Sequence, residues 1–573
     1  MDRRTFLRKN TAVLTAPATG LAERPAEPGG AEEETVSRYA NTALPSTARS
    51  TAGIAPYTGT WGYEQAAHLL RRTLFGPTRT EIVTAAGRSL TQVVNDLLTV
   101  PAAPAPPVNV SATDTSVAIG STWVTQPFDQ NFESVRRSSL RAWWLGQMLT
   151  QNLSLVEKMT LFWHNHFVIE FGDINDARHA YQYTALLRQH ALGNIKQLAK
   201  DVTVNAAMLR YLNGNQSTAS APNENYGREL LELFTVGKGP LIGAGNYTTY
   251  TEADVQAAAR VLTGWRDNQA TISSYYTASR HDTGTKVFSA AFGNATIPNG
   301  GDQEYKTLID LIFNQPETAR FLVRKLYRWL VYYVIDATTE QNVIEPLAQL
   351  LIQNGYNVAP VLRTLLSSEH FYDAVNMGCL IKSPLDFTLT VGRQLQITFP
   401  PASNPVAQYG MWDYLNSLTN LQQQLVGDPP NVAGWAAYYQ TPQYYEMWIN
   451  AVTLPRRNQF TDQMISTTGY TRNSFKINID VLALVQSLPA ATAQEPNLLI
   501  AELARLLLPI SLTTGQLAFL NDVLLPGLPD FEWTDEWTQY LAAPTNTAKK
   551  TAVTTKLQAL LRTMMGLAEY HLS

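Results

Sequence analysis

Apolar residues recur with helical spacing along most of the chain, and the alternation typical of strands is scarce. Many of these segments start after Ser, Thr, Asn or Pro, as helices do. We expect helices at residues 63–75, 79–86, 90–98, 134–152, 155–167, 177–191, 223–236, 252–264, 316–334, 340–353, 358–367, 384–396, 412–424, 498–507, 513–524 and 547–569. The pattern predicts a mainly α protein, a large multi-helix single body with a small irregular β-hairpin insertion.

The best strand candidates lie within residues 270–299, where the segments TISSYYTASR and TKVFSAAFG can pair beside a loop. Residues 101–126 are rich in Pro, Ala, Ser and Thr, which predicts a surface excursion. Compact structure is expected to begin near Trp61.

The N-terminus resembles a twin-arginine export signal. Arg3 and Arg4 precede Phe6 and Leu7, and a short, mildly apolar stretch with small residues follows. The chain therefore divides into a signal peptide at 1–22, a flexible linker at 23–60, a helical core domain at 61–458 and a helical C-terminal region at 459–573. We expect export to the periplasm or the extracellular space.

Composition narrows the function classes. Lys+Arg 43 and Asp+Glu 47 give a formal charge of -4, and no long basic run is present, which argues against nucleic acid as a partner. The single Cys379 excludes an intramolecular disulfide and a cysteine-based metal cluster. No uninterrupted apolar run reaches the roughly 18 residues of a transmembrane span.

Two histidines stand inside apolar and aromatic sequence. His164 and His166 belong to the segment KMTLFWHNHF at 158–167. On a helix, residues two apart point in nearly opposite directions, whereas on a strand they share a side. The pair is a shared metal site only if the segment is extended or if other elements complete two separate sites. The alternative is a helix end with stacked aromatic and histidine side chains.

The segment PNENYGRELLELFTVGKG at 222–239 carries the densest group of ionisable residues. On a helix, Asn225, Glu229 and Glu232 share one face, and Glu224 and Arg228 form an i, i+4 pair. An ordinary amphipathic helix with a solvated acidic face explains this pattern. The functional alternative is a carboxylate pair, with Asn and Arg, that faces a cleft and performs acid–base chemistry or binds a metal.

His281 and Asp282 follow in the loop of the expected hairpin. Loops often carry functional residues, so His281 is a further candidate for the same site.

Several blocks in a fixed order resemble the family filed as domain of unknown function 1800. They are HLLRRTLFG at 68–76, WHNHF at 163–167, PNENYGRELLELFTVG at 222–237, YTEADVQAAARVLTGW at 250–265, HDTGTK at 281–286 and PPNVAGW at 429–435. The resemblance implies an exported, largely helical bacterial protein and brings no catalytic residues with it. Phe234 and Val236 stand where the family more often has His and Leu.

Three hypotheses about function follow. In the first, the protein is a hydrolase or lyase that acts on an extracellular polymer such as polysaccharide, with the catalytic candidates Glu224, Asn225, Arg228, Glu229, Glu232, His164, His166 and His281. In the second, it is a metal-dependent enzyme whose divalent ion is bound by His164, His166, Glu229, His281 and Asp282. In the third, it is a non-enzymatic surface scaffold or the partner of another exported protein. The sequence identifies no other cofactor.

Overall fold

The computed structural model describes residues 49–435 and 447–573, so the predicted signal peptide and residues 23–48 of the predicted linker lie outside the described residues. Residues Ser50–Ser573 form one compact unit. The backbone N–H of Tyr57 donates to the carbonyl of Ser367 at 2.8 Å, and Ser50 Oγ donates to Asp373 at 2.6 Å. The last residues assigned to the linker are therefore part of the compact unit, which begins ahead of Trp61.

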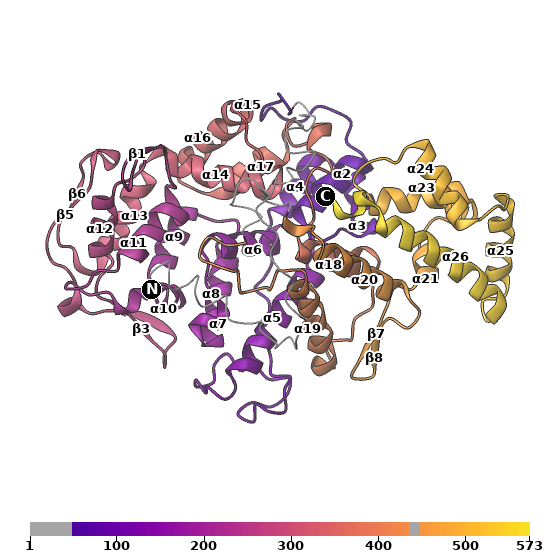
Figure 1. Cartoon of the computed structure of the whole chain (residues 1–573), viewed down its shortest axis with the longest axis horizontal. Coiled ribbons are helices and arrows are strands. Elements are labelled where there is room, and N and C mark those ends of the chain that lie inside the picture. The colour runs from indigo at the N-terminus through magenta and orange to yellow at the C-terminus, as the bar shows by residue number, and fades with distance from the viewer. Residues whose placement is uncertain (1–48, 436–446) are drawn as a thin grey trace, which may run out of the picture. The chain divides into compact units, whose positions relative to one another are not determined.

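The described part of the chain is mainly α, as the sequence predicts (Figure 1). Its first half contains α2 Tyr63–Thr73, α3 Arg79–Ala86, α4 Leu90–Leu97, α5 Glu133–Thr150, α6 Val156–His166, α7 Phe171–Ile174, α8 Ala177–Gln189, α9 Ile195–Thr203, α10 Ala206–Tyr211, α11 Glu224–Glu229, the π-helix η2 Leu230–Thr235 and α12 Glu252–Val261. The middle contains α13 Glu304–Phe313, α14 Pro316–Leu330, α15 Ala337–Thr339, the π-helix η6 Glu340–Ile344, α16 Glu345–Gln353, α17 Val358–Leu366, α18 Pro384–Gln394 and α19 Pro405–Leu421. The C-terminal part contains α20 Thr453–Ile465, α21 Val481–Gln486, α22 Ala490–Gln494, α23 Pro496–Leu507, α24 Thr514–Leu524, α25 Phe531–Ala542 and α26 Thr547–Gly566.

Local sequence explains many of the helix boundaries. At the start of α3, the Thr78 hydroxyl accepts from the N–H of Glu81, and the Glu81 carboxylate accepts from the N–H of Thr78. Thr251 and Asp254 form the same reciprocal pair at α12. Such pairs satisfy backbone donors that a helix leaves free at its first turn. The sequence missed α7, α9, α10, α13, α15, α20, α21, α22 and α25, and α19 begins seven residues before the expected start at 412.

The predicted hairpin is wrong in its pairing. The described strands form four separate antiparallel pairs: β1 Leu241–Gly243 with β2 Asn246–Tyr247, β3 Trp265–Asn268 with β4 Ser273–Tyr276, β5 Lys286–Val287 with β6 Thr296–Ile297, and β7 Tyr470–Arg472 with β8 Phe475–Ile477. The segment at 273–276 therefore pairs with the upstream residues WRDN at 265–268, whereas 286–287 pairs with 296–297. Two short hairpins replace the single irregular one.

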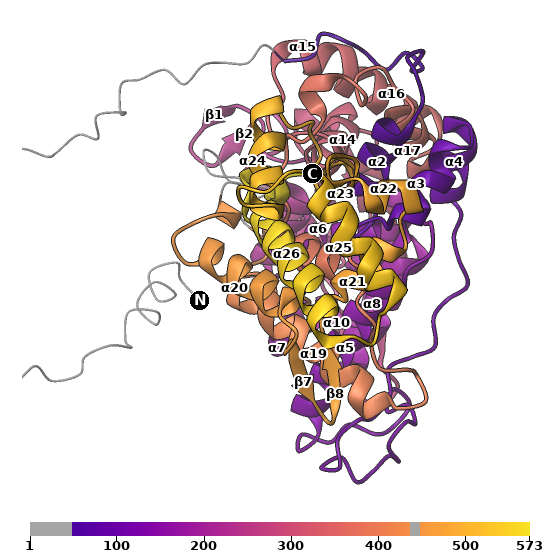
Figure 2. The ribbon, with the colours of Figure 1, turned by 90° about the vertical axis from the view of Figure 1, so that its right-hand side faces the viewer.

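One hydrophobic cluster joins the described helices, with members from Tyr63 to Tyr570. Helices from distant parts of the chain lie side by side, as α5 and α19 do (Figure 1). In the C-terminal part, α26 packs on α20, α24 and α25 (Figure 2). Among the described helices, none has the length and apolar character needed to cross a bilayer.

Candidate functional site

His164 lies in the hydrophobic core, on helix α6. Its ring packs on Trp144 and Phe171, with centroids 5.2 and 5.6 Å away, and neither ring nitrogen has a hydrogen-bond partner among the described residues. Burial lowers the pKa of His164 to about 3, because desolvation disfavours the imidazolium. The side chain is a neutral core group, in line with the stacked-aromatic alternative.

His166 instead joins α6 to two other helices. Its Nε2–H donates to the carbonyl of Phe234 at 3.0 Å, and its Nδ1 accepts from Lys325 Nζ at 3.0 Å. Lys325 also donates to the carbonyl of Leu233 at 2.9 Å. Burial lowers the pKa of His166 and of Lys325 well below the usual values. Since the segment is helical, His164 and His166 point to different environments and share no site.

The acidic block is helical, as predicted, but it changes from α11 to the π-helix η2 at Leu230. Glu224 and Asn225 are exposed. Arg228 does not pair with Glu224: it binds Glu252 of α12 with two hydrogen bonds of 2.8 and 2.6 Å. The expected i, i+4 pair is therefore wrong, because a residue from the neighbouring helix competes for the guanidinium.

The other two carboxylates of this block have separate partners. Glu232 accepts from the Tyr250 hydroxyl at 2.9 Å and lies 2.5 Å from Lys238 Nζ. Glu229 is half-buried and lies near Tyr211, whose pKa is raised first by burial and then by Glu170, with smaller contributions from Asp173 and Glu229. The two side chains thus interact with different groups.

His281 belongs to a buried charged network that includes Lys286 of the β5–β6 hairpin. Its Nδ1 lies 2.9 Å from the Thr263 carbonyl, and its Nε2 lies 2.9 Å from Glu304 Oε1. Lys286 Nζ donates to Glu304 Oε2 at 2.6 Å, and the side chains of His281, Lys286 and Glu304 are at most 1% exposed. Asp282 points elsewhere and binds Arg260 at 2.7 and 2.9 Å, which lowers its pKa.

The five residues of the metal hypothesis therefore do not gather. In the ranges that the structure describes, no group of three or more His, Cys, Asp or Glu side chains is placed to hold a metal ion. His166 and His281 already use their ring nitrogens in protein hydrogen bonds, and His164 is enclosed by aromatic rings. The catalytic roles assigned to these blocks stay predictions without a shared site.

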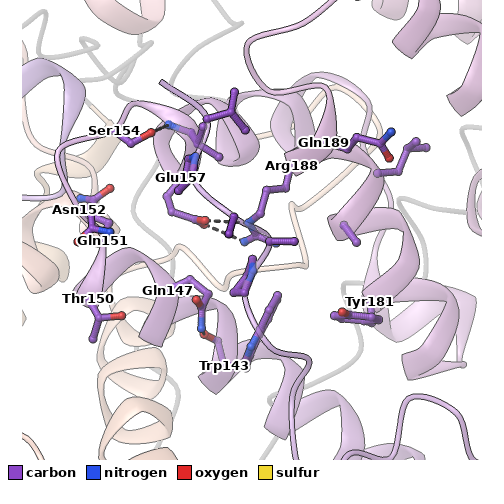
Figure 3. A pocket seen from close by; sticks show the side chains of 18 of the residues that line it. Trp143, Gln147, Thr150, Gln151, Asn152, Ser154, Glu157, Tyr181, Arg188 and Gln189 are labelled. Atoms are coloured by element: carbon purple, nitrogen blue, oxygen red, sulfur yellow. Dashed lines mark hydrogen bonds and ion pairs between the residues drawn. The ribbon is translucent and has the colours of Figure 1, made fainter. Parts of the chain in front are cut away.

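A different set of residues lines a pocket of about 810 Å³ (Figure 3). We call it the central pocket. Its polar and aromatic lining consists of Trp143, Gln147, Thr150, Gln151, Asn152, Ser154, Glu157, Tyr181, Gln182, Arg188, Gln189 and Asn205. Residues 101–104, the start of the predicted surface excursion, contribute to the wall together with Val100 before them.

Two helices, α5 and α8, supply nearly half of the lining, each through one face. On α5, Trp143, Gln147 and Thr150 stand four and three residues apart and so lie on one side. On α8, Gln182, Leu186 and neighbouring residues repeat the same spacing. The first turn of α6 adds Glu157. The pocket therefore lies between three helices that also bury their opposite faces in the core.

The centre of the lining is a fixed ion pair beside two aromatic rings. Arg188 Nε and Nη2 donate to the two oxygens of Glu157 at 2.7 and 2.8 Å (Figure 3). The guanidinium lies 5.0 Å from the Trp143 ring, and the ring of Tyr181 meets Trp143 edge-on at 5.6 Å. Burial raises the pKa of Tyr181, so its phenol stays neutral and can donate a hydrogen bond.

Sequence reasoning missed this pocket. In the sequence, the pocket corresponds to amide side chains on one face of α5 and of α8, next to aromatic residues. The same pattern is typical of any solvent-exposed helix face, so it does not identify a site. The pairing of Glu157 with Arg188 joins residues 31 positions apart and cannot be read from local spacing.

Comparison with known proteins gives one match. No curated protein and no solved structure is similar enough to this chain to count as a relative. Residues 68–572 match the model of the family described as "Protein of unknown function (DUF1800)", which confirms the resemblance of the ordered motifs. The chain belongs to this family.

Proposed function

We propose that the protein is an exported carbohydrate-binding protein whose central pocket holds a segment of an extracellular polysaccharide. The observation that carries the proposal is the lining, in which amide and hydroxyl side chains surround an aromatic edge and a neutralised ion pair. Amides both donate and accept hydrogen bonds, as sugar hydroxyls do, and aromatic rings suit the apolar faces of sugar rings.

Charge in the pocket favours an uncharged ligand. Among the lining residues that the structure describes, Arg188 is the one cationic side chain, and Glu157 binds it through two hydrogen bonds. A site for phosphate or carboxylate groups would present a cation without such a partner. Gln147, Gln151 and Gln182 instead offer neutral donors and acceptors. The volume of about 810 Å³ lies within the range of ordinary small-molecule sites.

Binding is better supported than cleavage at this site. Glycoside hydrolysis by the common mechanism needs two carboxyl groups roughly 5–9.5 Å apart. Within the described part of the lining only Glu157 has a carboxyl group, and Arg188 binds it. A hydrolase or lyase acting through the Glu and His blocks would need those blocks in one site, and their partners differ.

Titration calorimetry with soluble gluco-, chito- and galacturonic oligosaccharides tests the proposal. We expect binding of a neutral series and a loss of about tenfold in affinity, or roughly 1.4 kcal/mol, for Tyr181→Ala and for Gln147→Ala. Phe531→Ala, which removes an exposed aromatic ring from α25, is the matched control and keeps full affinity. Absence of binding to every oligosaccharide would refute the proposal. Release of new reducing ends would show that the protein is a hydrolase and not only a binding protein.

Export by the twin-arginine route is part of the same proposal. It is supported by Arg3 and Arg4 at the start of the chain, ahead of a short apolar stretch. Changing both residues to Lys is expected to retain the protein in the cytoplasm, measured by fractionation of cells that express the full chain. Equal export of the Lys–Lys variant would contradict this route.

A further inference from the structure

We infer that the ligand is an extended chain that runs through three adjoining hollows, with the central pocket in the middle. This rests on the proposed carbohydrate binding and adds the length of the ligand. The two flanking hollows have volumes of about 460 and 350 Å³. Each shares lining residues with the central pocket, so a chain leaving the pocket on either side enters another hollow.

The larger flanking hollow, which we call the Phe399 hollow, adjoins the pocket at Thr150 and Gln151. Its other lining residues include Phe399, Trp412 and Gln408. These repeat the combination of aromatic ring and amide that lines the central pocket.

The cation of the Phe399 hollow is also neutralised. Arg393, on α18, donates to the Glu81 carboxylate at 2.8 Å and to the carbonyl of Gly76 at 3.0 Å. The same guanidinium donates to the backbone carbonyl of Gln151 at 3.3 Å and so holds the backbone where the two hollows adjoin.

The smaller flanking hollow, which we call the Ser273 hollow, adjoins the pocket at Gln182, Leu186 and Asn205. Ser273 and other residues of the β3–β4 hairpin form its outer side. Asp201 lines it and lies 3.1 Å from His190 Nε2, so its carboxylate also has a partner. Asn205 holds its place as the cap of α10, where its side chain accepts from the N–H of Ala207 at 2.9 Å.

Both flanking hollows contain a residue in the left-handed backbone region. Ile272, with φ 53°, lines the Ser273 hollow, and Gln396, with φ 53°, lines the Phe399 hollow. Residues other than glycine are uncommon in this conformation, and a β-branched residue such as Ile272 is especially so. Such backbone strain is found disproportionately at ligand-binding sites. The two ends of the proposed path therefore share a feature as well as a lining chemistry.

Three hollows in a row predict how affinity depends on chain length. Once one unit is bound, the next unit binds at a high effective concentration, so each occupied hollow increases the affinity. Dissociation constants should fall at least tenfold from disaccharide to longer oligosaccharides and then level off when all hollows are filled. A single isolated pocket predicts no gain beyond the shortest ligand that fills it.

Calorimetry with the oligosaccharide series that binds, from disaccharide to octasaccharide, tests the path. Phe399→Ala removes one of the two aromatic rings that line the Phe399 hollow, and Ser273→Trp fills the Ser273 hollow from an exposed position. Each variant should lose most of the gain from added length and keep disaccharide affinity within about twofold. Ser511→Trp, at an exposed serine between α23 and α24, is the control for the added ring. Melting curves confirm that the variants fold.

The outcomes separate this inference from the proposal on which it rests. Tight binding of short ligands, with no gain from length and no effect of Phe399→Ala or Ser273→Trp, overturns the extended path and leaves the central pocket intact. No binding at any length overturns both. If only Ser511→Trp removed the gain in affinity with oligosaccharide length, the ligand would bind elsewhere on the protein, and the extended path would also be overturned.

Discussion

The central pocket and the polar blocks around His166 and His281 use polar side chains in opposite roles. In the blocks, charged and imidazole groups are enclosed and bind each other or backbone carbonyls, as Lys286 does with Glu304. In the pocket, one ion pair is enclosed and the amides around it line open space. The residues that look most unusual in the sequence thus hold helices together, and common residues form the cavity.

The difference has a physical cause. A polar group inside apolar sequence must be buried with its partners, because an unpartnered buried group costs free energy. A binding surface has no such requirement before its ligand arrives, so its residues resemble any hydrated helix face. Polar residues within apolar sequence therefore indicate buried side chains with partners. They indicate a functional site only when they also line a cavity.

The largest effect should come from breaking the buried network of His281. Glu304→Ala removes the acceptor of Lys286 at 2.6 Å, of His281 at 2.9 Å and of the Gly300 N–H at 2.9 Å. Because it leaves a buried cation without its partner, we expect a loss of about 3–5 kcal/mol in unfolding free energy. Thermal melting measures the loss.

The matched control is a carboxylate of an exposed pair. Asp462→Ala breaks the bond to Arg562, whose side chain and that of Asp462 are about half exposed, and should cost less than about 1 kcal/mol. Oligosaccharide affinity of the folded Glu304→Ala protein should stay unchanged. Similar melting of the two variants, or lost binding without lost stability, would assign the network to function.

The next effect concerns acid and the neutral core histidine. Since the pKa of His164 is about 3 when folded and about 6.5 when unfolded, the unfolded chain binds one more proton between these values. Stability from His164 is therefore complete above pH 6.5 and falls by about 1.4 kcal/mol per pH unit below it. His164→Leu should remove that slope between pH 6 and pH 4 and should raise the unfolding free energy at pH 8 by about 1–3 kcal/mol, because it removes two buried nitrogens that have no partner among the described residues. Urea midpoints across this range provide the measurement, and parallel curves would show that His164 is accessible to protons when folded.

Much of the fold follows from the sequence, because helix starts are local. The prediction of 79–86 agrees with α3 to the residue, and the Thr78–Glu81 pair that starts this helix joins residues close together in the sequence. The change to a π-helix at Leu230 could not be predicted from the sequence, because it depends on other helices. Within η2, the carbonyls of Leu233 and Phe234 accept hydrogen bonds from Lys325 and His166. Strand pairing failed for a different reason: Ser273–Tyr276 pairs with Trp265–Asn268 in a local hairpin, and the expected strand region of 270–299 begins after that first strand has ended.

The site was less predictable than the fold. The sequence identified histidines and carboxylates correctly as unusual, but it could not tell that Glu304 and Lys325 would satisfy them. It assigned residues 101–126 to the surface, and the start of that segment forms a wall of the central pocket. A cavity depends on which helix faces meet, and spacing along one helix does not contain that information.

A smaller effect should appear when the ion pair of the pocket is unbalanced. Glu157→Gln keeps the size of the side chain and leaves Arg188 without a charged partner in the lining. Affinity for galacturonic oligosaccharides should rise about three- to tenfold relative to the neutral series, an effect near 1 kcal/mol that added salt reduces. The Gln182→Glu variant, which adds a carboxylate to the same lining, should shift selectivity the other way. Unchanged selectivity in both variants would mean that the ion pair does not meet the ligand.

The smallest effect should follow from the acidic helix, where the sequence had placed the chemistry. Arg228 and Glu252 form a two-bonded pair, but about a third of each side chain is exposed, so water screens their attraction. Arg228→Ala should therefore lower the unfolding free energy by less than about 1 kcal/mol and leave oligosaccharide affinity unchanged. Glu224→Ala, at an exposed neighbour one turn away, should have no effect on either quantity. If Arg228→Ala instead abolished binding while the protein melted normally, the acidic face would be the functional surface and the contrast with the central pocket would be reversed.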